Sequence, residues 1–380
     1  MVYFILIFLS IVSIVVFDVY KFPKYKRIYK FILWVVAVLT MGLRYRVGID
    51  TLNYMEYFSD YPTMRYLTYD YIIDHNFSPL FVILNSLSKS IYDSFYTFQI
   101  IHAIIINACI FKFIFKNTNY PFIGLLLFFA MYYLYFNTEI LRESFAISVF
   151  LLNYSNLKQK KWVSYYLLSI VSILFHSSAL ILLLFPLVRF IRLNWTYLIM
   201  LVVFVVLIIE IHPFLVFLEN FEKISNKVNV YIDYEKLNLT WVAYNLIQIT
   251  LFPLFLLFVY KKILRQNSEY EYLICIHALL GIGILFFQLI FTRFSNYTLP
   301  FLAIFFADFI GSLIRDFSDK KYLYKMMMTL IIVVYASAYF ISAGYYADGA
   351  RRYHFWLPYH SVFDEKTEDK RETIWINQFN

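Results

Sequence analysis

Long apolar runs follow one another along the chain, and lysines, arginines or clusters of polar residues end each of them. Most runs approach the roughly 20 residues that an α-helix needs to cross a bilayer. We therefore predict an all-α, polytopic integral membrane protein with about twelve transmembrane helices, in a single domain over residues 1–380. The expected spans are 2–20, 28–43, 95–115, 121–136, 140–156, 162–175, 178–190, 195–215, 241–260, 272–290, 294–314 and 326–343.

One further apolar piece, residues 79–92, is too short to span and is interrupted by polar side chains such as Asn85, Ser86 and Lys89. We expect a re-entrant or interfacial helix there. If this piece crossed the membrane, every later basic loop would face outward, which opposes the charge bias of the loops.

The basic residues are concentrated in short loops on one predicted side. Loops at 21–30, 112–116, 158–161, 189–192, 261–265 and 315–325 hold more than half of the Lys and Arg residues. The positive-inside rule places these loops in the cytoplasm and both termini outside. The outer segments are then loops 44–94 and 216–240 and a tail at 344–380. The chain opens with no basic residue before its apolar run, so we expect a retained first span and not a signal peptide.

Composition narrows the class of protein. Hydrophobic residues make up 62% of the chain and charged residues only 15%, against about 25% charged in an ordinary soluble domain. This excludes a typical cytosolic enzyme, a disordered scaffold and a nucleic-acid-binding protein. The net charge of +8 is spread over many loops, and Cys109 and Cys275 both lie in apolar runs. Neither a disulfide framework nor a thiolate metal site is expected.

The predicted topology gathers several polar residues at the outer membrane boundary: Arg44, Arg46, Asp50, Arg142, Glu143, His176 and Arg293. An arginine within hydrocarbon costs about 2.5 to 3.5 kcal/mol, so such residues usually line a cavity or meet an anion. Any one of them could instead anchor a helix end at lipid headgroups. Arg142 is the strongest candidate because it lies in a polar stretch between two spans with almost no loop.

The histidines allow more than one role. His176 either caps a helix end or acts as a general base, whereas His102 and His277 lie within spans and suit polar packing. The sequence shows no Gly-rich phosphate loop, His-Glu-x-x-His, Gly-x-Ser-x-Gly or Asp-x-Asp motif. We expect no metal and no cofactor, and a donor carried by a lipid fits better than a soluble nucleotide.

Five segments occur in a distinctive order. They read LRYRVGIDTLNY at residues 43–54, ILRESFA at 140–146, FHSSA at 175–179, TRFSNY at 292–297 and LPYHS at 357–361. Together they resemble the EpsG-like branch of the Wzy-type polysaccharide polymerases over nearly the whole chain. Two departures from the family pattern are Asn76, near a position where glutamate is frequent, and Glu143, where glutamine is frequent.

The resemblance implies a polymerase that joins oligosaccharide repeat units carried on undecaprenyl diphosphate, at the outer face of the bacterial inner membrane. It also implies a GT-C-like architecture and metal-independent glycosyl transfer. The expected partners are lipid-linked donor and acceptor, membrane lipid and no nucleic acid; a copolymerase that regulates chain length could be another. We assign catalysis to His176, Arg142, Glu143, Arg293 and Asp50, and substrate binding to Arg44, Arg46, Asn53, Tyr54, Tyr297 and Tyr359.

Other functions would use the same arginines. A flippase or transporter also binds a lipid diphosphate, but it would be expected to show repeats or an ionisable track through the bilayer. A ligase that moves finished chains to another acceptor has nearly the same chemistry. An acyltransferase would use the histidine and leave the arginines unexplained.

Overall fold

The structure is a computed structural model, and in the part of the chain that it describes the chain folds into α-helices. That part comprises residues 2–48, 50–74, 77–218, 242–243, 245–315, 329, 331–333, 335 and 356–364. Its only β-type pairing is an isolated bridge between Arg44 and Ser361. The chain divides into two compact units: unit 1 comprises 1–179 and 306–380, and unit 2 comprises 180–305.

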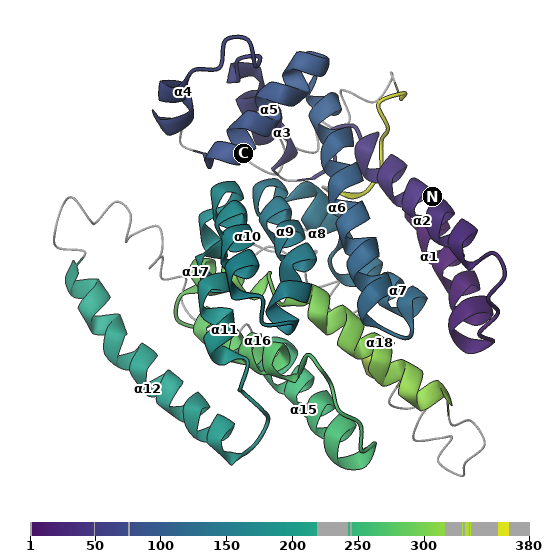
Figure 1. Cartoon of the computed structure of the whole chain (residues 1–380), viewed down its shortest axis with the longest axis vertical. Helices are drawn as coiled ribbons and strands as arrows, with labels where there is room; N and C mark the ends of the chain where they lie inside the picture. Colours follow the sequence, from purple (N-terminus) through teal and green to yellow (C-terminus); the bar gives the residue numbers. More distant parts are fainter. Residues whose placement is uncertain are drawn as a thin grey trace. The chain divides into compact units, whose positions relative to one another are not determined.

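Unit 1 holds the first eleven helical segments (Figure 1). They are α1 Val2–Ser13, the π-helical continuation η1 Ile14–Val19, α2 Lys26–Gly42, α3 Thr51–Asp60, α4 Tyr69–Asp74, α5 Pro79–Ile91, α6 Phe95–Asn117, α7 Pro121–Met131, α8 Tyr133–Thr138, α9 Leu141–Lys158 and α10 Trp162–Phe175. The 3₁₀ segment η2, Ser177–Leu184, leads from unit 1 into unit 2.

Helix starts follow local sequence rules. Pro79 and Pro121 open α5 and α7, where a missing N–H costs nothing because the first turn has no intrahelical acceptor. Ser94 caps α6 by accepting a hydrogen bond from the Tyr96 N–H at 3.3 Å. The helices then pack on aromatic side chains, among them the perpendicular Phe81–Phe98 pair at 5.6 Å.

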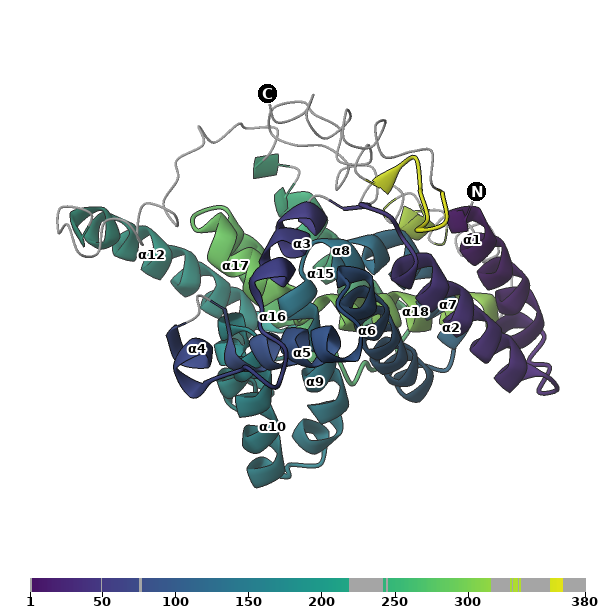
Figure 2. The same ribbon diagram turned by 90° about the horizontal axis from the view of Figure 1, so that it is seen from above.

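Neighbouring long helices of unit 1 run antiparallel. α2 lies beside α6, and α9 lies beside α10 (Figures 1 and 2). At one end of the first pair, Gln99 Nε2 donates to the Gly42 carbonyl at 2.9 Å. At the other end, Lys30 Nζ lies 4.4 Å from the centre of the Phe115 ring. The two ends of unit 1 are therefore distinct surfaces with different residues.

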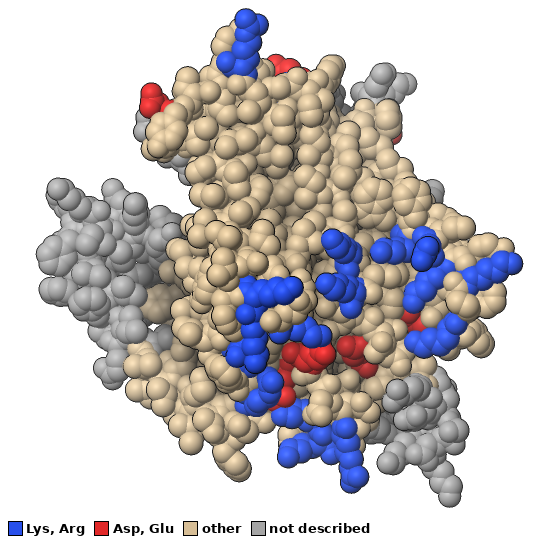
Figure 3. All heavy atoms as spheres, viewed as in Figure 1, with Lys and Arg blue, Asp and Glu red and all other residues tan. Residues whose placement is uncertain are grey.

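The end near Lys30 is rich in lysine. Lys21 Nζ donates to the Asn119 carbonyl at 3.4 Å and lies over the Tyr120 ring, so the α1–α2 and α6–α7 turns meet there. Figure 3 shows blue side chains gathered over this end of α1, α2 and α6. We call this surface the lysine end. It brings together loops for which the positive-inside rule predicts a cytoplasmic location.

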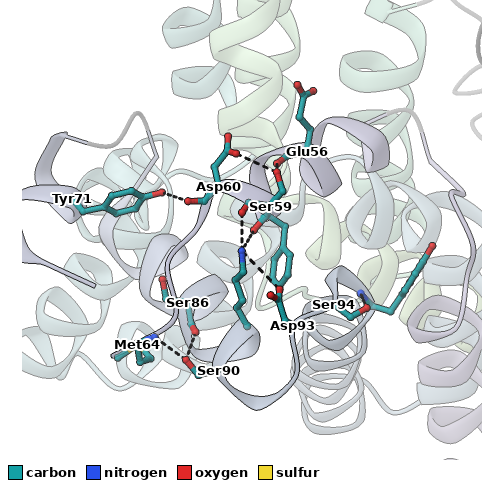
Figure 4. A network of polar contacts seen from close by, with 12 residues as sticks. Glu56, Ser59, Asp60, Met64, Tyr71, Ser86, Ser90, Asp93 and Ser94 are labelled. Atoms are coloured by element: carbon teal, nitrogen blue, oxygen red, sulfur yellow. Dashed lines mark hydrogen bonds and ion pairs between the residues drawn. The ribbon is translucent and has the colours of Figure 1, made fainter. Parts of the chain in front are cut away.

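At the opposite end, α3, α4 and α5 form a small helical cap (Figures 1 and 4). Lys89 Nζ donates to the carbonyls of Phe58 at 3.3 Å and Ser59 at 2.7 Å, which satisfies acceptors in the last turn of α3. The Met64 N–H donates to Ser90 Oγ at 2.7 Å. These bonds fasten the loop after α3 to α5, so the expected short interfacial piece at 79–92 is a helix that braces the cap.

Unit 2 contains α11 Phe185–Val188, α12 Trp195–Leu218, the π-helical η3 Leu246–Leu251, α15 Phe252–Phe258, η4 Val259–Ile263, α16 Glu271–Ile284, α17 Gln288–Ser295 and the start of α18 Leu299–Arg315. The buried Glu271 carboxylate accepts hydrogen bonds from Lys261 Nζ and from the Leu193 N–H. Tyr197 donates to the Cys275 carbonyl at 2.8 Å. Polar contacts thus join α12, the loop before it, η4 and α16 on an otherwise apolar background.

The predicted spans coincide with helices, but their number is not confirmed. Three described helices are long and apolar enough to cross a membrane, at Val2–Val19, Phe95–Asn117 and Leu246–Ile263. A fourth is counted if α17 and α18, bent by 53°, form one span. The expected spans at 121–136 and 178–190 are interrupted, the first at Tyr132 and the second by 3₁₀ geometry. Most of 326–343 and of the loop 216–240 lies outside the described residues.

Candidate functional site

Arg44 directly follows α2 and is fully buried at the end of unit 1 opposite the lysine end. Its guanidinium donates to the Met41 carbonyl and, through Nε, to the Val47 carbonyl at 3.2 Å. Burial lowers the pKa of Arg44 to about 10, while neighbours that include Glu139 act to raise it. The guanidinium therefore stays charged at neutral pH. Its Nη2 atom has no hydrogen-bond partner among the described residues.

The segment 356–364, drawn in yellow in Figure 2, pairs with the chain directly after α2. Arg44 forms the bridge with Ser361, and the Tyr45 N–H donates to the His360 carbonyl at 2.8 Å. Tyr359, half-buried, donates its hydroxyl to the Thr40 carbonyl at 3.0 Å. The LRYR and LPYHS segments, more than 300 residues apart in sequence, therefore form one structure at the end of α2 opposite the lysine end.

Glu139 is the acceptor that joins three segments. Its Oε1 accepts from Trp356 Nε1 at 2.9 Å and from Thr138 Oγ1 at 2.8 Å. Its Oε2 accepts from the Asp50 N–H at 3.3 Å. The carboxylate is 7% exposed, so these donors supply much of what water would otherwise give it. The C-terminal segment, α8 and the loop after α2 all meet at Glu139.

Gly48 explains why this loop can approach α8 so closely. Its φ of +115° is a conformation that residues with a side chain rarely adopt. A Cβ atom there would lie 2.6 Å from Cβ of Thr138 and 2.8 Å from Thr51 Oγ1. The glycine of the LRYRVGID segment is thus required by both backbone and space.

Arg142 has surroundings unlike those of Arg44. It lies in the first turn of α9, is half-buried, and places its guanidinium carbon 4.2 Å from the centre of the Phe77 ring. Its Nε is buried without a hydrogen bond, and within the described residues no carboxylate pairs with it. A helix N-terminus favours an anion nearby, and the aromatic ring holds the guanidinium in place without neutralising its charge. This arrangement suits an anionic ligand.

Glu143, Ser178 and His176 form a short polar chain beside Arg142. Ser178 Oγ lies 2.7 Å from His176 Nδ1, and the Ser178 N–H donates to the same nitrogen at 3.2 Å. The Ser178 hydroxyl also lies 3.4 Å from Glu143 Oε1. Glu143 is 1% exposed, whereas His176 is half-buried. The structure thus brings together two of the predicted catalytic residues through a serine.

The remaining predicted residues of the first outer loop lie at the same end of unit 1. Arg46 is half-buried, with its guanidinium carbon 5.3 Å from the centre of the Tyr45 ring. Asp50 is half-buried, and Asn53 on α3 is exposed. Tyr54 is 9% exposed and packs edge-on against Phe81. Asn53 is therefore the best exposed of these candidate substrate contacts.

The match to known families covers all of these positions. The model of the EpsG family matches residues 27–361. The chain belongs to the EpsG family. Proteins of this family are Wzy-type polymerases, and with the apolar helices this indicates a membrane protein with a polymerase-like role in polysaccharide biosynthesis. No curated protein and no solved structure matches the chain.

Two of the predicted site residues of this EpsG-family protein belong to unit 2. Arg293 is half-buried in the last turn of α17, and Tyr297 is fully buried in the turn before α18. Their convergence with Arg142 stays a prediction. In the described part of the chain, no three His, Cys, Asp or Glu side chains gather in a way that could hold a metal ion.

Sequence reasoning missed Glu139, Ser178 and Trp356 as parts of the site. Glu139 directly precedes the segment 140–146, and Ser178 lies within the segment 175–179. Their polarity inside helical, apolar surroundings was an available signal. Trp356 had no comparable signal, because only the fold brings its indole N–H to Glu139.

Proposed function

We propose that this EpsG-family protein is a polysaccharide polymerase that joins oligosaccharide repeat units carried on undecaprenyl diphosphate. The reaction would take place at the outer face of the bacterial inner membrane, within a GT-C-like architecture. The observation that supports this most is the setting of Arg142: a half-buried guanidinium at a helix N-terminus, without a carboxylate partner among the described residues. Such a group is prepared for a diphosphate.

The chemistry is glycosyl transfer at the anomeric carbon of the growing chain. The bond from this carbon to the lipid diphosphate breaks, and the diphosphate leaves with the electron pair. A hydroxyl of the incoming lipid-linked unit forms the new glycosidic bond and gives up its proton. The transition state resembles an oxocarbenium ion. Metal-independent transfer then depends on cations that stabilise the leaving group.

Arg142 and Arg293 would bind the diphosphate, because the arginine fork matches phosphate oxygens. Arg46, half-buried on the same end of unit 1, would assist. Arg44 has no exposed surface and holds the carbonyls of its own loop, so we assign it to positioning. The proton would be accepted by His176, Glu143 or Asp50.

We assign sugar binding to the predicted substrate-binding residues other than the arginines. Asn53 is exposed, and Tyr54, Tyr297 and Tyr359 lie in segments that match the family. Tyrosine combines a flat apolar face with a polar tip, which suits pyranose rings. A copolymerase that regulates chain length could act as a partner of the same outer face.

A reconstituted reaction tests this proposal. The purified protein in vesicles receives one synthetic, undecaprenyl-diphosphate-linked repeat unit, and the products are separated by length. A ladder of lipid-linked oligomers, with release of undecaprenyl diphosphate, supports polymerisation. Transfer only to an acceptor without a prenyl diphosphate would show a ligase, and movement of the intact unit across the bilayer without a new glycosidic bond would show a flippase.

Arg65 offers a matched control for the arginine site. It is exposed and lies over the Tyr66 ring at 5.7 Å. Arg65→Ala removes an arginine from the same end of unit 1 without touching the proposed site, so it should polymerise like the unaltered protein. A loss in Arg65→Ala equal to that in Arg142→Ala would mean that general surface charge, and not a built site, explains the effect.

A further inference from the structure

The hydrogen bonds around His176 define which of its nitrogens carries a proton. The Ser178 main-chain N–H donates to Nδ1 at 3.2 Å. A main-chain N–H can only donate and cannot rotate away, so Nδ1 must present its lone pair. In neutral imidazole the proton then resides on Nε2.

We infer that Ser178 is a positioning residue that holds His176 as an Nε2–H hydrogen-bond donor, and that His176 donates to an oxygen of the lipid-linked substrate instead of accepting a proton from it. This inference rests on the proposed function and refines one of its roles. The proton of the attacking hydroxyl then passes to a carboxylate, for which Glu143 and Asp50 stay the candidates.

The local backbone explains why this arrangement is stable. His176 ends α10 with extended dihedrals, φ −158° and ψ 132°, and the 3₁₀ segment η2 starts at the next residue. Its side chain therefore occupies the place of a cap for η2, where a side-chain acceptor binds a main-chain N–H two residues on. If Nδ1 took up a proton, its N–H would face the main-chain N–H of Ser178. The hydrogen bond that caps η2 would then be lost.

Ser178 adds a second constraint through its side chain. Its hydroxyl lies 2.7 Å from Nδ1 and 3.4 Å from Glu143 Oε1, and Ser178 is only 7% exposed. With Nδ1 as an acceptor, the single hydroxyl proton of Ser178 is directed to Nδ1, the nearer of its two acceptors, and the main-chain N–H donates to the same nitrogen. The imidazole, the serine and Glu143 are thus held in one orientation.

Two substitutions separate a donor from a base. In His176→Gln the side-chain amide nitrogen takes about the place of Nε2 and still donates. In His176→Asn the amide oxygen takes about the place of Nδ1, so the cap to Ser178 is kept while the donor is lost. Neither amide can act as a base at neutral pH.

We expect His176→Gln to keep turnover within about tenfold of the unaltered protein and His176→Asn to lose on the order of 10² or more, as for removal of one preorganised donor. A loss in kcat with unchanged KM would assign the donor to the departing diphosphate oxygen. A rise in KM would assign it to a sugar hydroxyl. Equal, large losses in both variants would overturn the inference and restore His176 as the base.

Nitrogen resonances test the protonation state without any activity measurement. Protein labelled with ¹⁵N-histidine is compared with His176→Gln, so that the difference spectrum isolates the signals of His176. We expect the Nδ1 resonance to be that of a nitrogen without a proton, and the Nε2 resonance to be that of a protonated nitrogen. The reverse pattern would overturn the inference even if polymerisation is confirmed. Failure of all proteins to polymerise would instead count against the proposed function.

Ser177 provides the local control. It is exposed and adjacent to His176, so Ser177→Ala tests disturbance of the segment alone and should leave both the spectrum and the turnover unchanged. Ser178→Ala keeps the main-chain N–H and should therefore keep the Nε2–H form. If Ser178→Ala switches the ring to the Nδ1–H form, the hydroxyl and not the main chain sets the proton, and the assignment fails.

Discussion

The two ends of unit 1 use positive charge in different ways. At the lysine end, Lys21 and Lys30 extend over aromatic rings and main-chain carbonyls near the surface. At the opposite end, Arg44 is fully buried and Arg142 half-buried. Flexible, hydrated ammonium groups suit a surface that orients a chain in a membrane, whereas planar guanidinium groups can be fixed in a buried place. The difference separates flexible charge near the surface from charge that is fixed in a buried place.

Within the second end, Arg44 and Arg142 form a further contrast. Arg44 satisfies carbonyls of its own loop next to Glu139. Arg142 has an aromatic ring beneath it and no carboxylate partner in the described part of the chain. The first arrangement stabilises a loop, and the second leaves charge for an anion.

Arg142→Ala should have the largest effect on activity. Loss of one preorganised cation near a developing charge should reduce turnover by about 10² to 10³. Arg142→Lys keeps the charge but loses the fork, so it should recover only part of the activity. The measurement is the initial rate of extension of lipid-linked repeats in vesicles. A normal rate in Arg142→Ala would remove this residue from the site.

Glu139→Ala should have the largest effect on stability. It removes the acceptor that the Asp50 N–H and the Trp356 indole N–H share and leaves the indole only its longer bond to Thr138 Oγ1 at 3.2 Å. Losing a hydrogen bond to a charged group costs about 1.5 to 3 kcal/mol. We expect a clearly lower thermal unfolding temperature in detergent, together with earlier proteolysis of the C-terminal segment. Glu56→Ala, an exposed glutamate on α3, is the control. Equal stability of the two variants would show that Glu139 does not hold the segments together.

Tyr359 should have a smaller effect, on stability at alkaline pH. Burial raises the pKa of this phenol from 10.0 to about 12. Because the folded state holds the proton more tightly, the contribution of Tyr359 to stability is full below pH 10 and is lost as pH rises towards 12. Unfolding followed across this window should show an alkaline decline that Tyr359→Phe reduces. An identical decline in both proteins would assign it to other groups.

Lys30→Ala should have the smallest effect. A cation on the Phe115 ring contributes about 0.5 to 1 kcal/mol at an exposed site. We expect little change in unfolding temperature or in polymerisation, measured as above. A loss of polymerisation as large as that of Arg142→Ala would end the distinction between the two ends of unit 1.

Much of the helical structure follows from local sequence. Apolar runs, the prolines at the starts of α5 and α7 and the serine before α6 all act within a few residues. The predicted runs accordingly coincide with helices, including the short one at 79–92. The breaks at Tyr132 and in η2 were not predicted, since packing and polar caps decide where an apolar run changes pitch.

The sequence by itself determined that the chain is helical and apolar, which loops carry lysine, and which five segments mark the EpsG family, because hydropathy and motifs are local properties. Only the tertiary structure decided that Trp356 donates to Glu139, that Arg44 is enclosed while Arg142 is not, and that Ser178 joins His176 to Glu143. The same side chain can brace a loop or bind an anion. Its burial and its partners decide which, and these come from residues far apart in the chain.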